Sequence, residues 1–337
     1  LSGGTSIMAI IDKPSDYFRT KLYAGNATNN RAITWDETNT NMQADLLWFK
    51  SRTDTQTHGI WDSVRGAIKR LIPSSTGAEG DEANDLDSFD TNGFTVDSAA
   101  NMNGSSRNYV TWGWKAETSF TNDASAAGFS IISYTGNATT NATVAHGLGV
   151  APSMMIVKKL NGAFNWGIYH KTLTAHKLIT FTTNTPDDDA SYWNDVEPTS
   201  TVFNLGSGAL TNGSGSTMIA YCFAEKQGFS KFSSYTGNGN ADGTFIYTGF
   251  KPAFIMIKRT DVAKNWYIND NLRDGYNNDN PYLSPNLNAA ETGGTEIDIL
   301  SNGFKITASG TGHNASGGTY IYMAIAENPF VASNFNA

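Results

Sequence analysis

The sequence predicts an all-β protein made of three tandem β-sandwich, jelly-roll-like repeats of about 100 residues each. A short motif, Tyr-x-Gly-Asn, recurs three times, as KLYAGNATN (21–29), ISYTGNATT (132–140) and FSSYTGNGN (232–240). Apolar residues alternate with the period of two that is typical of strands. Charged residues make up only 16% of the chain, against about 25% in ordinary domains, which leaves little material for salt-bridged helical faces.

The landmarks around each motif recur in the same order. Each motif is followed by an apolar run that ends in basic or polar residues, then by a tryptophan, and finally by a strand that ends in Ala-Glu. The tryptophans are Trp61, Trp166 and Trp266, which we interpret as core residues, and the glutamates are Glu117, Glu225 and Glu327. Successive copies of these landmarks predict an N-terminal extension at 1–16 and repeats at 17–118, 128–226 and 229–330.

Strand patterns dominate inside each repeat. In 129–134, alternate residues face opposite sides, and the run stops at Gly136-Asn137, a pair that tolerates a turn. The best helical pattern is SVRGAIKRLI at 63–72, which Gly66 weakens. The basic residues that end the apolar runs are expected to cover sheet edges, where charge discourages unwanted strand pairing. They are Lys158, Lys159, Lys258 and Arg259.

Composition excludes several classes of partner. The formal charge of −8 and the isolated basic pairs argue against nucleic-acid binding. No apolar run approaches the roughly twenty residues that a spanning helix needs, so we expect no membrane insertion. With one cysteine, no intrachain disulfide framework is expected. Met8 is a plausible start, which leaves open whether Leu1–Ile7 is native.

Motifs for catalysis are missing from the sequence. It contains no Gly-x-Ser-x-Gly, no phosphate-binding Gly-rich loop and no His-Glu-x-x-His, and we predict that the protein is not an enzyme and needs no cofactor. Cys222 is expected to be a small buried residue, not a nucleophile. The histidines are scattered and are interpreted as ordinary polar residues without a metal role. They are His58, His146, His170, His176 and His313.

The acidic loop PDDDASYWNDVEP (186–198) is the best candidate binding site. An aromatic ring beside carboxylates suits a glycan, because a sugar face stacks on the ring while the oxygens bond its hydroxyls, and Ca²⁺ would also accept such oxygens. The alternative is a solvated loop with the tryptophan beneath it. The loops at 79–90 and 269–282 are similarly oxygen-rich, without the EF-hand order of ligands. The candidate glycan-binding residues are Asp188, Asp189, Tyr192, Trp193 and Asp195.

Several stretches resemble a known family. The runs are MAIIDKPSDYF, LYAGN, DLLWFKSR, SVRGAIKRL, SFDTNGFTV and YVTWGWKAE. They are similar to the repeated β-domain of uncharacterised tail and tail-fibre-type structural proteins of marine and cyanobacterial tailed phages. The resemblance implies a virion component, made in the cytoplasm of a bacterial host, with no defined catalytic site.

Three functions are consistent with these features. The favoured one is a structural protein of the phage tail or tail fibre that contributes to host attachment. The others are a lectin-like adhesin module that binds carbohydrate and a capsid decoration or head-fibre protein. The expected partners are other virion proteins and a host-surface glycan. The repeats favour either a homotrimer or a pseudo-threefold monomer, because three similar units in one chain can themselves form a ring.

Overall fold

The computed structural model describes residues 11, 13–37, 39–116, 127–273, 277 and 280–328. The fold is all-β, as the sequence predicts. Within the described residues the helices are three short ones: η1 (Pro14–Asp16), α1 (Ala190–Trp193) and α2 (Ala209–Asn212). We divide the chain into a first segment (13–116), a second (127–226) and a third (227–328).

Each segment contains one four-stranded antiparallel sheet, here called its central sheet. The strand that opens the segment pairs with the strand that closes it, which in turn pairs with a central hairpin. The first sheet is β1 (Phe18–Ala24), β9 (Asn108–Trp114), β3 (Leu46–Ser51) and β4 (Gly59–Asp62). The second is β10 (Phe129–Thr135), β17 (Thr217–Phe223), β12 (Met154–Lys159) and β13 (Gly167–His170), and the third is β18 (Ser230–Thr236), β24 (Thr319–Asn328), β20 (Lys251–Arg259) and β21 (Trp266–Asp270).

A smaller outer sheet packs on each central sheet. Its inward phenylalanine meets the tyrosine of the repeated motif: ring centroids of Tyr23 and Phe94 lie 6.0 Å apart, and the other two segments repeat this contact. Each segment therefore has two packed layers. The outer sheets are β2 (Arg31–Thr34), β8 (Gly93–Val96) and β7 (Leu86–Asp90); β11 (Ala142–Ala145) and β16 (Val202–Leu205); and β19 (Phe245–Tyr247), β23 (Gly303–Ile306) and β22 (Ile297–Leu300).

Two small hairpins complete the regular structure of the described residues. In the first segment β5 (Lys69–Arg70) pairs with β6 (Gly80–Asp81). In the second segment β14 (Lys177–Leu178) pairs with β15 (Asp187–Asp188). The first hairpin lies in the long connection after β4, and the second lies in the long connection after β13.

The register of strand pairing defines equivalent positions in the three segments. Leu46 of β3 pairs with Trp114 on one side and with Asp62 on the other. Met154 occupies the same place in the second sheet and Phe254 in the third. The residues that correspond to Asp62 are therefore His170 and Asp270.

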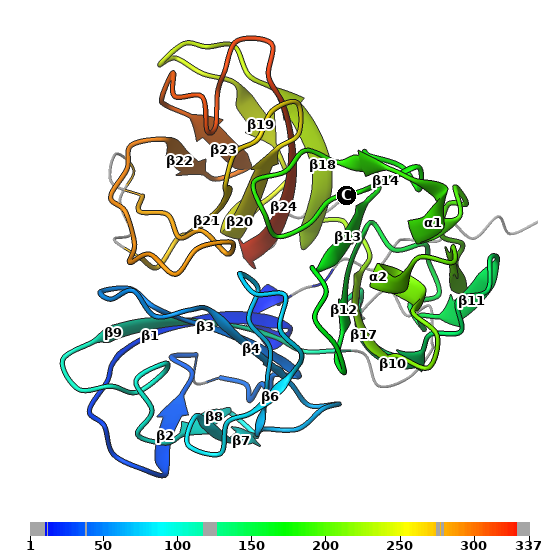
Figure 1. Cartoon of the computed structure of the whole chain (residues 1–337). Helices are drawn as coiled ribbons and strands as arrows, with labels where there is room; N and C mark the ends of the chain where they lie inside the picture. The colour runs from blue at the N-terminus through cyan, green and yellow to red at the C-terminus, as the bar shows by residue number, and fades with distance from the viewer. Residues whose placement is uncertain are drawn as a thin grey trace, which may run out of the picture.

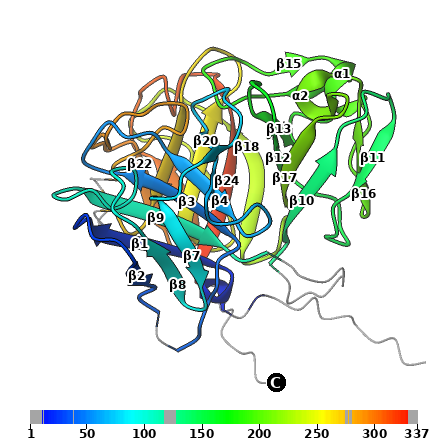
Figure 2. The same cartoon turned by 60° about the horizontal axis from the view of Figure 1, so that its bottom comes forward.

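The three central sheets share one apolar core. Figure 1 shows the three segments side by side around a common centre, and Figure 2 shows the same grouping from a second direction. Trp114 of the first segment lies 5.4 Å from Phe254 of the third and 6.4 Å from Phe223 of the second, measured between ring centroids. The remaining gap at the centre is only about 10 Å³. Such dense packing of large rings removes much apolar area from water and holds the segments together.

The stretch 63–72, which carries the best helical pattern of the sequence, does not form a helix. This stretch forms turns and then β5, and the side chains of Val64 and Ile68 are 51% and 47% exposed. Gly66 has φ of +95°, which a helix does not allow, and Leu71 instead pairs with Ile60 of β4 as an isolated bridge. The apolar residues of this stretch have helical spacing in the sequence, but they do not lie on one buried face.

Parts of the predicted boundaries lie outside the described residues. These are residues 1–10 and 12 of the predicted N-terminal extension, including Leu1–Ile7, the end of the first repeat from Glu117 onward, and residues 329–330 at the end of the third repeat. Residues 274–276 and 278–279 of the predicted oxygen-rich loop also lie outside them.

Candidate functional site

Trp193, the centre of the predicted glycan site, is buried. Its side chain is 1% exposed, and its ring meets Tyr169 edge-on at a centroid distance of 6.1 Å. It belongs to the second segment's own apolar core. The ring therefore offers no face on which a sugar could stack, and the predicted stacking role of Trp193 is wrong. The arrangement observed is the alternative, with the tryptophan beneath a polar loop.

Two carboxylates of this loop bond within the loop, and others bond to residues outside it. Asp189 caps α1 by accepting a hydrogen bond from Ser191 N at 2.7 Å, and Asp195 lies 3.2 Å from His176 Nδ1. Tyr192 donates its hydroxyl proton to Asp187 at 2.8 Å. Burial, and to a lesser degree this hydrogen bond to Asp187, raises the pKa of Tyr192 to about 12. Asp188 is exposed in β15.

In the part of the chain that the structure describes, no group of three or more His, Cys, Asp or Glu side chains is arranged to hold a metal ion.

The tyrosine of the repeated motif ties the opening strand of each segment to a distant loop. Tyr23 donates its hydroxyl proton to Met102 O at 2.6 Å, Tyr134 to Thr211 O at 2.7 Å and Tyr235 to His313 O at 2.8 Å. Each acceptor immediately precedes an asparagine that completes the contact. The three tyrosine contacts match one another, so the motif has a structural role in all three segments.

The asparagine of the motif makes the same turn three times. Its side chain accepts a hydrogen bond from the backbone N–H two residues later, as from Thr139 N to Asn137 Oδ1 at 2.9 Å. A second asparagine, Asn212 in this segment, receives the backbone N–H of Asn137 at 2.8 Å and donates to Thr139 O at 3.1 Å. The residue between them has positive φ in every copy: Ala27, Ala138 and Gly239.

The glycine of the motif is required by close approach of two backbones. A Cβ on Gly136 would lie 2.3 Å from Gly213 O, and the equivalent Gly25 and Gly237 meet carbonyl oxygens at 2.1 and 2.4 Å. Only a residue without a side chain fits there. The motif therefore repeats because each segment closes its opening strand with the same backbone and side-chain contacts.

Three buried lysines occupy one equivalent position, and this corrects the prediction that Lys158 and Lys258 cover sheet edges. They and Lys50 lie at the end of a central strand and are 0% exposed. Burial lowers the pKa of each ammonium group to about 8. Lys159 and Arg259 lie beside them; Arg259 is 8% exposed and pairs with Asp261 at 2.7 Å.

These lysines bond to backbone carbonyls, and two of them reach a neighbouring segment. Lys158 Nζ donates to Phe164 O at 2.6 Å and to Thr76 O of the first segment at 2.9 Å. Lys258 Nζ donates to Lys264 O at 2.8 Å and to Thr183 O of the second segment at 3.1 Å. Charge buried in this way is stable only because hydrogen bonds replace its hydration. Lys158 and Lys258 therefore act as links between segments.

A second set of contacts joins the segments in a cycle. The backbone N–H of Glu79 donates to Leu160 O at 3.0 Å, joining the first segment to the second. Lys264 N donates to Thr183 O at 3.0 Å, joining the third to the second. Glu291 N donates to Arg52 O at 2.9 Å, which joins the third segment back to the first. The side chains of Arg52 and Glu291 add an ion pair at 2.9 Å.

The tryptophans are buried, as predicted, but only two of them are equivalent. Trp166 Nε1 donates to Ile72 O of the preceding segment at 3.0 Å, and Trp266 Nε1 donates to Thr180 O at 2.8 Å. By register, the matching position in the first segment is that of His58, three residues before Trp61. Trp61 instead covers Gly59 within its own segment. The sequence alignment of Trp61 with the other two was therefore shifted by three residues.

Buried carboxylates form the third kind of link. Asp62 accepts from Arg65 Nε at 2.5 Å and from the hydroxyl of Tyr221, in the second segment, at 2.7 Å. Its equivalent Asp270 accepts from Arg273 Nε at 2.6 Å and from Trp112 Nε1, in the first segment, at 3.0 Å. Both carboxylates are 0% exposed. His170 occupies the corresponding place in the second segment, and its Nε2 lies 3.1 Å from Tyr322 O of the third.

The remaining titratable groups suit structural roles. Burial lowers the pKa of His170 and His313 to about 4, and lowers those of His58 and His146 as well. Burial also raises the pKa of the Cys222 thiol to about 12, which leaves it protonated and unreactive at neutral pH. His176, by contrast, is more than half exposed.

A comparison with protein families gives one match. A family described as a domain of unknown function, DUF7483, matches residues 13–329. None of the curated proteins matches the chain. Among the described residues, the structure contains no helix that is long and apolar enough to cross a membrane.

Proposed function

This chain belongs to the DUF7483 family, and we propose that it is a structural protein of a phage virion, in the tail or tail fibre. The proposal combines the resemblance of the sequence stretches to phage tail proteins with the construction of the molecule. In it, the chain has no catalytic role and contributes architecture and a surface for attachment. Its setting is the virion, after synthesis in the cytoplasm of a bacterial host.

We infer that the three segments are tandem repeats of one β-sandwich unit, arranged as a pseudo-threefold ring. The same strand order, register and motif contacts in each segment support this inference. A homotrimer achieves such an arrangement with three chains, whereas here a single chain of 36.3 kDa provides all three units. The pseudo-threefold monomer is thus the form we favour over the homotrimer.

The observation that carries the proposal is the closure of the ring. Contacts between the first and third segments, such as that of Glu291 with Arg52, match contacts between segments that are adjacent in sequence. Closed threefold bodies suit a position on a threefold axis of a larger assembly. Buried histidines and a protonated Cys222 fit an architectural role better than a chemical one. The expected partners are therefore other virion proteins and the host surface.

Electron microscopy of particles tests the location. An antibody raised against the chain, detected with gold on particles purified from the source culture, should label the tail. Labelling of the capsid would favour the alternative of a decoration or head-fibre protein. Chain that is present in the lysate but absent from purified particles would overturn the virion proposal.

Light scattering on the purified chain tests the ring. We expect a mass of 36.3 kDa, because the three interfaces are satisfied within one chain. A stable species of three times this mass would contradict the monomeric ring and favour a fibre made of three chains.

A further inference from the structure

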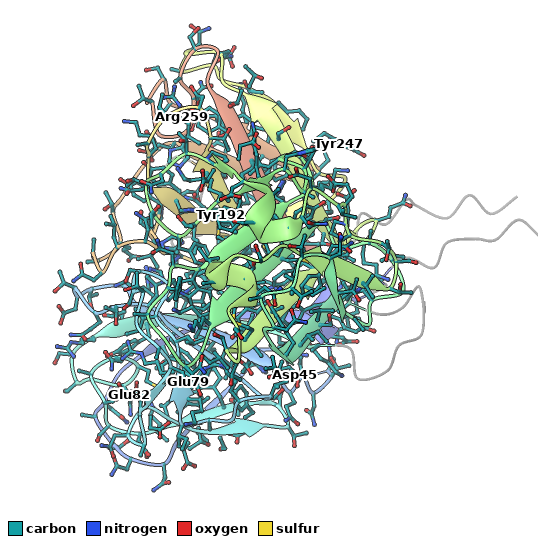
Figure 3. All side chains as sticks on the ribbon, turned by 45° about the vertical axis from the view of Figure 1, so that its right-hand side comes forward. Asp45, Glu79, Glu82, Tyr192, Tyr247 and Arg259 are labelled. Atoms are coloured by element: carbon teal, nitrogen blue, oxygen red, sulfur yellow. The ribbon has the colours of Figure 1, made fainter. Side chains whose placement is uncertain are left out.

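One outer sheet differs from its two counterparts in a way that exposes aromatic rings. On the outward side of β19, Phe245 is 45% exposed and Tyr247 is 63% exposed. They are the aromatic residues among the exposed large hydrophobic side chains in the part of the chain that the structure describes. Figure 3 shows Tyr247 at the periphery of the third segment.

The register shows what the other segments carry at these positions. Ile246 pairs with Phe304 in the third segment as Ile33 pairs with Phe94 in the first and Val144 with Phe203 in the second. The positions of Phe245 and Tyr247 therefore correspond to Ala32 and Thr34 in the first segment and to Thr143 and Ala145 in the second. All four of these counterparts are exposed.

The fold does not need aromatic residues here. The first and second segments form the same edge strand with small residues. The two rings of the third segment point outward and therefore add nothing to the core. Exposed aromatic rings cost solubility and increase the risk of edge pairing, so their presence in one copy calls for a role outside folding.

The surface around the rings contains a glycine, Gly303, and several polar groups. Tyr247 pairs with Gly303 on β23, and the ring of Phe245 lies over the same glycine, 3.2 Å from where its Cβ would be. Lys305, directly opposite Phe245, forms an ion pair with Asp242. The ammonium group offers donors and the carboxylate, which is 88% exposed, offers acceptors. Rings and hydroxyl-binding groups thus lie side by side.

The size of the surface favours a small occupant over a protein. Two aromatic rings contribute roughly 150–250 Å² each when covered, whereas a stable protein interface takes about 800 Å² from each partner. Strand addition is also poorly supported, because β19 has three residues and is followed by Gly249 at φ of +85°. A partner strand would find few backbone bonds there.

We propose that the outward face of β19 and β23 binds carbohydrate, with Tyr247 and Phe245 as stacking rings and Lys305 and Asp242 as hydroxyl partners. The apolar face of a pyranose covers a ring while its edge hydroxyls reach donors and acceptors beside it. This inference rests on the proposed function, for which it supplies the host-contact surface. It moves the glycan site from the loop at 186–198 to the third segment.

The test compares variants on a printed array of bacterial lipopolysaccharides, capsular polysaccharides and exopolysaccharides. The double variant Phe245→Ala with Tyr247→Thr gives the third segment the residues of the first, so the chain itself shows that the strand tolerates them. Val262→Ala, which removes an exposed apolar side chain elsewhere in the third segment (40% exposed), is the matched control. Circular dichroism and thermal melting verify that all three proteins are folded.

We expect the natural chain and Val262→Ala to bind the same glycans, and the double variant to bind them about tenfold more weakly or worse, as expected for two lost stacking contacts. Equal binding by the double variant would overturn the assignment of this face. Failure of the natural chain to bind any glycan on the array would overturn carbohydrate as the occupant.

The location experiment separates this inference from the proposed function. Particles that contain the double variant but adsorb to host cells more slowly would support both. Particles that contain it and adsorb normally would refute the binding face and leave the virion role intact. Exclusion of the natural chain from particles would refute the virion role even if it binds glycans in isolation.

Discussion

Loss of the Asp62 carboxylate should destabilise the protein strongly. The side chains of Asp62 and Arg65 are 0% and 4% exposed, so Asp62→Ala leaves a guanidinium buried beside a single remaining carboxylate, Glu79, at 3.5 Å. Removing one member of a buried ion pair typically costs about 3–5 kcal/mol. The hydroxyl of Tyr221 also loses its acceptor, which weakens the contact between the first and second segments.

Equilibrium unfolding in urea, followed by tryptophan fluorescence, measures this loss. The shift of the midpoint multiplied by the slope gives the change in the free energy of unfolding, provided that the slope is unchanged. Asp36→Ala is the control, because Asp36 pairs with Lys21 at the surface and is 72% exposed. Such exposed pairs contribute about 0–1 kcal/mol.

A double variant checks the mechanism. If the uncompensated charge is the cause, Asp62→Leu with Arg65→Met should be more stable than Asp62→Ala, because no buried charge then lacks its partner. A cost below about 1 kcal/mol for Asp62→Ala would refute our view of this contact. A double variant as unstable as the single one would also refute it.

Three further predictions use the same unfolding assay. Lys158→Met should lose about 1–3 kcal/mol, since two carbonyl oxygens lose a buried, charged donor; a neutral result would show that water replaces the ammonium group. Gly136→Ala should lose a similar amount because its Cβ would lie 2.3 Å from a carbonyl oxygen, whereas Gly310→Ala, with open space, should not. Stability should fall as pH drops from about 6.5 to 4, because His170 binds a proton in the unfolded chain over this range but stays neutral in the fold, where its pKa is about 4. His170→Gln should reduce this pH dependence, and an unchanged pH profile would refute the assignment.

The all-β fold was predictable because its signals are local and occur three times. Tyr-x-Gly-Asn marks the end of an opening strand in each segment, and the glycine and asparagine are required by backbone geometry that any copy must reproduce. The motif therefore located the opening strand of each segment. The function of the motif was less accessible, because its partners Asn212 and Thr211 lie about 75 residues away in sequence.

Part of the error has a physical origin in contacts between segments, which do not appear in any one segment's pattern. Lys158 at the end of an apolar run resembles an edge-protecting charge. One of the carbonyl oxygens that its ammonium group bonds, Thr76 O, belongs to the neighbouring segment. His58 takes the place of a tryptophan, which no alignment by residue type would suggest. Trp193 looked available because its acidic neighbours are exposed, although its own ring packs inward.

The closed ring also makes the starting point of the chain interchangeable. Ser15, near the beginning of the first segment, and Ala326, near the end of the third, line the same hollow. A short linker between these ends, combined with a cut in the connection at 226–229, would give a circular permutant that begins with the third segment. Because a backbone hydrogen bond and an ion pair already join the first and third segments without a chain connection, such a permutant should fold to the same ring. The position of the chain ends would then not determine the fold. The cyclic order of the interfaces between segments would be the property that specifies the structure.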